Sequence, residues 1–432
     1  MDLRHTEADE DFRRELTTWL DANLPQDMRE SAFWADLSDT EQFDARRTWE
    51  KSKAAAGFAG IAWPTEYGGR GGTPTMKAIY DEEMAKANAP HTVNPLGLAF
   101  LAPTVMALGT EQQKQDIIKP LLHCQTIWCQ GFSETGAGSD LAALQMRAED
   151  QGDHYLLNGQ KIWTTNAMHG DKIFTLARTS SPDGGKKHAG ISMLLVDMDQ
   201  PGIEARPLKQ MTGDSEFGEV FYTDALCPKD AILGGEGNGW ATAMLLLSFE
   251  RGSSAIGQYT EFRRQWSDVV DIAQQVERDG RSAAQDPTIR QQLAAALVEL
   301  ECLKYHSWHV LTQTSQGKDL GFEASMTKMM WSETFRRVSD AYEDVLGTGF
   351  QVAHPQPGLS VQELTTRAMW SRSCTIWGGS QQVQRTVVAE RVLAAGPAAI
   401  QLRDKRGSAR ATLALSISGL LSSLLSCIAA AF

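Results

Sequence analysis

The chain has 432 residues, of which 42% are hydrophobic and 22% charged, and its formal net charge is −13. These fractions are typical of a folded protein with roughly two or three domains, or of one large multi-layer unit. The acidic balance argues against broad nucleic-acid binding, because no basic stripe would gather phosphates. The 6 cysteines are scattered without a CxxC pair, so we expect free thiols in a reducing compartment rather than a disulfide framework or a zinc site.

The first part of the chain, residues 1–126, predicts a helical domain. Apolar residues recur at helical spacing from Phe12 to Leu24. A second helix, TEQFDARRTWEKSKAAAG, should stop at Gly57, the usual position of a C-terminal glycine. A glycine-rich loop around Pro64 follows, and helices resume in TPTMKAIYDEEMAKANAP and in a short segment that should end near Pro120.

The pattern then changes to short β-rich segments and later returns to helix. In residues 127–233, segments such as HYLLNGQKIWTTN and GISMLLVDM are separated by turn residues, which predicts an antiparallel sheet or barrel. Residues 234–397 predict a helical bundle, with helix expected from Gly239 to about Ala395. The expected fold is therefore α+β multidomain: helical, β, helical, and then a tail at 398–432.

The tail is basic at first and then uncharged from Ala411 to Phe432. As a helix it would be about 33 Å long, enough to cross a bilayer core, although its serines make it a marginal span. A helix packed on the protein and an unstructured end are the alternatives. The N-terminus MDLRHTEADEDFRR is charged throughout, which excludes a secretory signal, so we expect a cytoplasmic protein with membrane contact through residues 411–432 as an alternative.

Two segments of the β-rich region carry chemistry. GFSETGAGSDLAAL, residues 131–144, gathers glycines and hydroxyls where a backbone can approach a ligand and offer N–H groups to an anion. LNGQKIWTTNA, residues 157–167, adds an indole at Trp163 and hydroxyls at Thr164 and Thr165, which suit a planar heteroaromatic cofactor. Taken singly, the first segment also fits a tight surface turn and the second a core tryptophan in a strand.

Together these segments resemble the acyl-CoA dehydrogenase family, whose signature is Phe-Ser-Glu-x-Gly-Ala-Gly-Ser-Asp followed by Asn-Gly-x-Lys-x-Trp-x-Thr-Asn. The two motifs stand here at Phe132–Asp140 and Asn158–Asn166. The similarity continues through WPTEYGGRGG, LLLSFERG and GGSQQVQRTVVAERVL, and it spans about residues 10–395. It implies a helical domain, a β domain and a four-helix bundle, with FAD as the cofactor.

The resemblance also implies which residues hold FAD. Phe132 and Ser133 would belong to the flavin site, with Ser133 bonding the pyrimidine side of the isoalloxazine. Trp163 would cover one flavin face, and Thr165 would bond near N5, the hydride acceptor.

The other half of the cofactor would lie on different residues. Ser139 would lie near the FAD pyrophosphate. Ser380 and Gln382 would meet the ADP half, commonly of an FAD bound to the neighbouring subunit. Thr135 replaces the usual proline of the signature, which should be tolerated.

The position of the catalytic base departs from the best-known members. Family chemistry removes an α-proton from an acyl-CoA and transfers a β-hydride to flavin N5, leaving a trans-2-enoyl-CoA. Burial raises the pKa of the carboxylate that takes the proton, which improves the transfer. Gly378 stands where the closing loop usually carries that glutamate. Its backbone N–H would still bond the thioester carbonyl.

A substitute for the base stands in LLLSFERG. Glu250 and Arg251 match the Glu-Arg pair in which branches for branched, long-chain and steroid substrates hold their base. We expect Glu250 to be the base and Arg251 to support it. The alternative is that Glu250 only pairs with a basic residue inside the bundle.

Two further departures concern FAD and the partner subunit. RDGRSAAQDPTIRQQL replaces a segment with an Arg-x-x-Phe-Gly cofactor contact, and EDVLGTGF places Glu343 where an amide usually meets the FAD diphosphate. These two departures resemble members of the family that work as mixed tetramers.

The functional hypotheses are a dehydrogenase that reduces an electron-transfer flavoprotein, an oxidase that uses dioxygen, and a non-catalytic or half-site subunit of a homo- or hetero-oligomer. No metal is expected, since His306 and His309 form only an HxxH on an amphipathic helix that carries no nearby trio of carboxylates.

Overall fold

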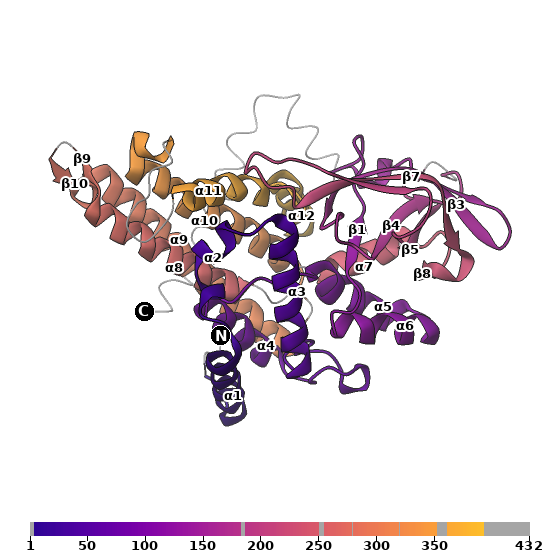
Figure 1. Ribbon diagram of the computed structural model, residues 1–432, viewed down its shortest axis with the longest axis horizontal. Coiled ribbons are helices and arrows are strands. Elements are labelled where there is room, and N and C mark those ends of the chain that lie inside the picture. Colours follow the sequence, from indigo (N-terminus) through magenta and orange to yellow (C-terminus); the bar gives the residue numbers. More distant parts are fainter. Residues whose placement is uncertain are drawn as a thin grey trace.

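The computed structural model describes residues 4–182, 186–249, 255–278, 280–318, 320–351 and 361–392. In chain order it contains helices, a β domain and helices again, which confirms the fold predicted from the sequence. Figure 1 shows the sheet at one end of the molecule and the long helices of the bundle at the other, with the N-terminal helices beside the bundle.

The N-terminal domain is helical, as predicted. Its helices are α1 (Glu7–Asn23), α2 (Ser31–Ala35), α3 (Asp39–Ala55), α4 (Pro74–Lys86), α5 (Ala102–Leu108) and α6 (Glu111–Leu122), with a π-helical turn at Gly97–Leu101. Capping boxes at Thr6, Ser38 and Thr110 begin α1, α3 and α6, because each side chain accepts a hydrogen bond from a backbone N–H of the first turn. Beyond the end of α3, Gly57 has a φ of 76°, which favours glycine.

The end of α6 agrees with the prediction. The helix was expected to stop near Pro120, and it ends at Leu122. Pro120 lies in the last turn, where the missing N–H costs one hydrogen bond and no long run of helix follows.

The middle domain is built on one sheet of eight strands. They are β1 (Trp128–Gly131), β2 (Arg147–Asp150), β3 (His154–Thr165), β4 (Lys172–Arg178), β5 (Ile191–Asp197), β6 (Ile203–Pro207), β7 (Phe217–Pro228) and β8 (Ile232–Leu233). Their order is β6-β7-β3-β2-β4-β5-β8, with β1 beside β4. Most pairs are antiparallel, as predicted, but β1 and β2 each pair with β4 in parallel.

Two hydrophobic cores hold this sheet. One joins β4 and β5 to α5, α6 and α7 (Gly239–Phe249), through residues such as Val105, Leu121, Phe174 and Leu246. The other contains apolar residues of β1 to β5 and β7, such as Tyr155. Because both cores include residues of β4 and β5, these two strands are buried almost continuously rather than in alternation.

The C-terminal domain is a helical bundle. After α7 it contains α8 (Ala255–Gln275), α9 (Pro287–Ser315), α10 (Glu323–Leu346), α11 (Val361–Cys374) and α12 (Gln381–Val392). The long helical stretch expected from Gly239 is interrupted by a hairpin, β9 (Glu277–Arg278) and β10 (Arg281–Ser282), with Gly280 at a φ of 73°. The local pattern missed this hairpin because each strand has only two residues.

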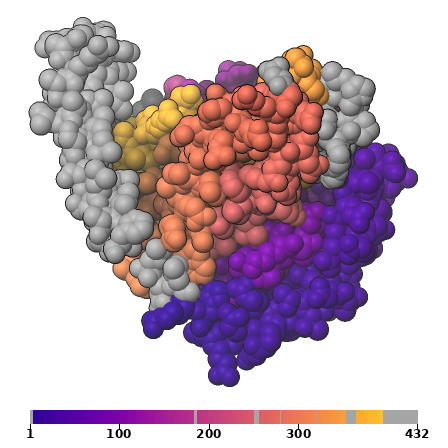
Figure 2. Space-filling view, turned by 90° about the vertical axis from the view of Figure 1, so that its left-hand side faces the viewer, coloured from indigo at the N-terminus to yellow at the C-terminus, as the bar shows by residue number. Residues whose placement is uncertain are grey.

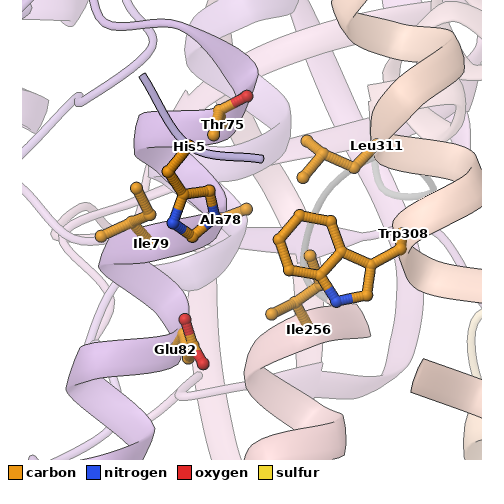
Figure 3. Close-up of a pocket in the computed structure, with 8 residues that line it drawn as sticks. All are labelled: His5, Thr75, Ala78, Ile79, Glu82, Ile256, Trp308 and Leu311. Atoms are coloured by element: carbon orange, nitrogen blue, oxygen red, sulfur yellow. The ribbon is translucent and has the colours of Figure 1, made fainter. Parts of the chain in front are cut away.

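The N-terminal domain packs directly on the bundle. Figure 2 shows the indigo and violet N-terminal helices lying along the orange bundle helices. Ala78 of α4 packs there with Ile256 of α8 and Leu311 of α9. A shallow hollow lies at this contact, and the His5 ring lies against Trp308 at its edge, 5.6 Å between centroids (Figure 3). The hollow has no room even for a water molecule, so it is no candidate for acyl-CoA.

Residues 411–432, for which a membrane span was the alternative, lie outside the described residues. Within the described ranges, no helix combines the length and the apolar character that crossing a membrane requires.

Candidate active site

The first motif forms a tight loop directly after β1. The carbonyl of Gly131 accepts a hydrogen bond from Thr175 Oγ1 at 2.7 Å, which fixes the end of the strand. Glu134 and Ala137 then exchange two backbone hydrogen bonds of 3.0 Å, so the loop folds back on itself. The Phe132 side chain lies in the core, edge-on to Phe174. The ring of Phe132 is therefore used in packing, and only its backbone is left to face a cofactor.

A buried ion pair joins the two motifs. Lys161 is fully buried, and its Nζ donates to the carbonyl of Phe132 at 3.1 Å and to Glu134 Oε1 at 2.8 Å. The Glu134 carboxylate also accepts the backbone N–H groups of Gln145 and Met146, at 2.7 Å and 3.0 Å. Burial lowers the pKa of the Lys161 ammonium to about 8. The pair holds the first motif against the second.

The sequence analysis missed Lys161 and Glu134. The signal was present, because the first motif contains the carboxylates of Glu134 and Asp140 and the second the ammonium of Lys161. Which of them meet depends on strands that come together only in the folded chain. The backbone reinforces the same contact, since Ile162 N donates to the carbonyl of Ser133 at 3.0 Å.

Trp163 is presented outward by a strained bulge. Between Lys161 and Thr164, β3 has one residue more than the facing part of β7, and Trp163 has a φ of 62°. Its indole is 56% exposed, although Lys161 and Thr164 are fully buried. This exposure overturns the alternative of a core tryptophan. A left-handed backbone at a bulky residue is costly and concentrates at functional sites.

A row of aromatic rings links Trp163 to the bundle. Trp163 meets Phe217 of β7 edge-to-face, with centroids 6.0 Å apart, and Phe217 stacks on Trp370 of α11 at 5.8 Å. Trp370 stands one helical turn before Cys374, the last residue of α11. The second motif and the segment that leads into the closing loop are thus brought together.

The closing loop, residues 375–380, connects α11 to α12. Gly378 and Gly379 have φ values of 66° and 89°, which favour glycine at both positions. Gln384 Nε2 donates to the carbonyl of Gly378 at 2.9 Å. Ser380 immediately precedes α12, and its Oγ accepts from Val383 N at 3.3 Å. This contact leaves the hydroxyl proton of Ser380 for another acceptor.

The other residues predicted for the site differ in how far they are exposed. Ser139 and Gln382 are exposed, and Ser133 and Thr165 are partly buried. Glu250 and Arg251 lie outside the described residues; α7 ends at Phe249, immediately before them.

The unfavourable charge expected at Glu343 has a partner. Arg372 of α11 places Nη2 3.7 Å from Glu343 Oε2, and it also pairs with Asp340. Both side chains of the first contact are well exposed, at 38% and 56%, so the attraction is screened by solvent. Arg372 therefore neutralises the Glu343 carboxylate only weakly.

The residues present fit a flavin. An exposed indole, the hydroxyls of Ser133 and Thr165, and a glycine-rich loop lie on neighbouring segments. A Cβ added at Gly136 or Gly138 would meet nothing within 4 Å, so space is open beside the loop backbone. No group of three metal-binding side chains occurs among the residues that the structure describes.

Comparison with known proteins identifies the family. The acyl-CoA dehydrogenase N-terminal domain matches residues 6–125, the middle domain residues 129–225 and the C-terminal domain residues 237–393. The chain is 37% identical over 390 residues to acyl-CoA dehydrogenase IpdE1 of Mycobacterium tuberculosis, which covers 89% of this chain and 97% of that protein. The chain belongs to the acyl-CoA dehydrogenase family, and its cofactor is FAD.

Solved structures agree with this assignment. The Tcur3481-Tcur3483 steroid ACAD is similar with a TM-score of 0.77 and 28% identity, over 91% of this chain and 99% of that chain. The ChsE4-ChsE5 complex from Mycobacterium tuberculosis gives the same TM-score, identity and coverage.

Proposed function

We propose that this chain is the catalytic subunit of an FAD-dependent dehydrogenase for acyl-CoA thioesters of the steroid-derived class. Trp163 would cover the flavin, and Ser133 and Thr165 would hold its polar edge. The Gly378 N–H binds the thioester carbonyl, and Glu250 removes the α-proton with Arg251 in support. FAD, when bound, supplies the acceptor for the β-hydride. The steroid class is supported by the solved structure named as a steroid ACAD.

The main support for a base outside the closing loop is the backbone conformation of that loop. A glutamate at position 378 would have to adopt a φ of 66°, which costs roughly 1–2 kcal/mol for a residue with a Cβ. The loop is therefore suited to glycine and to a backbone donor. The carboxylate must come from another segment, and Glu250 directly follows α7.

Glu250→Gln tests this assignment. The variant should keep FAD but lose the bleaching of the flavin by a panel of short, long, branched and steroidal acyl-CoAs under anaerobic conditions. Glu299→Gln is the matched control, because it removes one carboxylate charge from the same domain, at a side chain that pairs with Arg337, and should keep the bleaching. Undiminished reduction in the first variant would end the assignment of Glu250.

A second candidate function is a half-site subunit of a hetero-oligomer. Glu343 and the β9–β10 hairpin stand where cofactor contacts of the family are expected, and one of the similar structures is a complex of two differently named chains. The chain should then be colourless when purified alone and yellow when produced with a partner acyl-CoA dehydrogenase subunit. Full FAD occupancy in the isolated chain would remove this candidate.

The electron acceptor needs its own measurement. We expect the reduced flavin to be reoxidised by an electron-transfer flavoprotein. Formation of hydrogen peroxide under air, at the rate of substrate turnover, would instead indicate an oxidase.

A further inference from the structure

One face of α10 points at the closing loop. Lys328, Trp331 and Ser332 are spaced i, i+3 and i+4, so they lie together on the helix. All three are buried: Lys328 and Trp331 are each 8% exposed and Ser332 is fully buried. A buried lysine is uncommon unless its ammonium has partners.

Lys328 contacts the residue that precedes the loop, a residue within the loop and a ring of its own helix. Its Nζ donates to the carbonyl of Cys374, the last residue of α11. The same Nζ lies 4.3 Å from the ring centroid of Trp331 and 4.3 Å from that of Trp377, and the two rings are 5.4 Å apart. The ammonium thus sits between two indoles, one on α10 and one in the loop.

Each of these contacts favours a positive charge. The last carbonyls of a helix have no partner within it and carry the negative end of the helix dipole. Indole faces attract cations, and more strongly when water is excluded. A neutral side chain of the same length would fill the space but would satisfy neither the Cys374 carbonyl nor the two indoles.

The other end of the loop is held by the same turn of α10. Gln381, the first residue of α12, donates from Nε2 to Ser332 Oγ at 2.8 Å and to the carbonyl of Met329 at 3.3 Å. Gln384 holds the carbonyl of Gly378 between these anchors. The loop from Thr375 to Ser380 is therefore fixed at its start, middle and end.

We infer that Lys328 is a positioning residue for this loop. Through Trp377 and the Cys374 carbonyl it holds the segment that carries Gly378, and so it aims the Gly378 N–H at the substrate carbonyl. This inference rests on the proposed function for its effect on the reaction, although the effect on the loop does not require it.

Lys328→Met is the test variant, and Lys304→Met is the control. Lys304 also lies near aromatic rings, those of Tyr259 and Tyr305 at 5.7 Å and 5.5 Å, but it is 36% exposed and far along the chain from the loop. Both variants are prepared as the FAD-loaded protein, with the partner subunit if FAD requires it.

The first measurement is hydrogen exchange of the peptide that covers residues 375–380. In Lys328→Met we expect these amides to exchange about ten-fold faster or more, with FAD content and exchange in the middle domain unchanged. In Lys304→Met we expect no change. Unaltered exchange of the loop in Lys328→Met overturns the inference.

The second measurement is the rate of anaerobic flavin reduction by an acyl-CoA. A misplaced backbone donor should lower the maximal rate by about 10- to 100-fold while FAD affinity stays the same. In a Trp377→Leu background, Lys328→Met should have a smaller effect than in the wild type, because the contact with Trp377 is already lost and only the bond to the Cys374 carbonyl remains. Independent, multiplying effects overturn the inference.

Two further outcomes are decisive. If none of the acyl-CoAs tested reduces the flavin of the wild type, the proposed function fails. The exchange experiment still tests Lys328. If Lys328→Met does not fold, Lys328→Arg should keep the loop protected and Trp377→Leu alone should expose it. A Trp377→Leu variant with normal loop exchange overturns the inference.

Discussion

Replacing Lys161 with methionine should loosen the cofactor loop. The change keeps the length of the side chain and removes an ammonium that donates to the carbonyl of Phe132 and to Glu134. Glu134 would still accept hydrogen bonds from two backbone N–H groups, but it would lose its charged partner, the Lys161 ammonium. The link between the two motifs would then rest on the backbone alone.

The size of the effect follows from two opposing terms. Removing one member of a buried ion pair typically costs about 3–5 kcal/mol. The lowered pKa of the Lys161 ammonium means that its burial already destabilises the folded state near neutral pH, by about 3 kcal/mol relative to an ordinary lysine. Methionine relieves that penalty. We therefore expect a net loss of only about 0–2 kcal/mol near pH 7.

The effect should depend on pH with a definite sign. The pKa of Lys161 is about 8 in the folded chain and about 10.4 in the unfolded chain. Between these values the unfolded state binds more protons, so the wild-type free energy of unfolding rises with pH, by up to about 1.4 kcal/mol per pH unit. Lys161→Met lacks this rise. The stability lost on substitution should be larger at about pH 9.5 than near pH 7.

Chemical denaturation followed by tryptophan fluorescence measures this difference, and absorbance of the flavin after gel filtration measures FAD retention. Lys172→Met is the control, because Lys172 pairs with Asp197 at the same 2.8 Å but is 35% exposed. It should lose less than about 1 kcal/mol and keep its FAD. Equal losses in both variants at about pH 9.5, or a Lys161→Met loss that shrinks as pH rises, would refute the reasoning.

Three other substitutions test the remaining geometry. Asn94→Ala should cost roughly 2–3 kcal/mol in denaturation experiments, because the buried Asn94 accepts from Trp128 N and donates to the carbonyl of Thr126; a loss below about 0.5 kcal/mol would contradict this. Gly378→Ala should cost about 1 kcal/mol and slow flavin reduction without changing FAD content, because of its positive φ; equal rates would argue against the loop geometry. Trp163→Gly should release FAD yet leave the apoprotein as stable or about 1 kcal/mol more stable, since it relieves backbone strain; a large loss of stability would mean that the indole packs in the core.

Much of the fold could be predicted because its signals are local. The helix starts at Thr6 and Ser38 depend on residues within one turn, and the stop at Gly57 depends on one backbone angle. The change from helical to β spacing and back is also readable along the chain. The hairpin between α8 and α9 was missed because it is too short to produce a period.

The sequence by itself determined the order of the domains, the two cofactor motifs and the glycine at position 378. Only the tertiary structure decided what those residues do in space. Trp163 is exposed because β3 bulges against β7, and Lys161 reaches Glu134 across 27 residues of chain. Lys328 reaches Cys374 across 46 residues. Such contacts depend on how distant segments pack, and no local pattern of residue types encodes that packing.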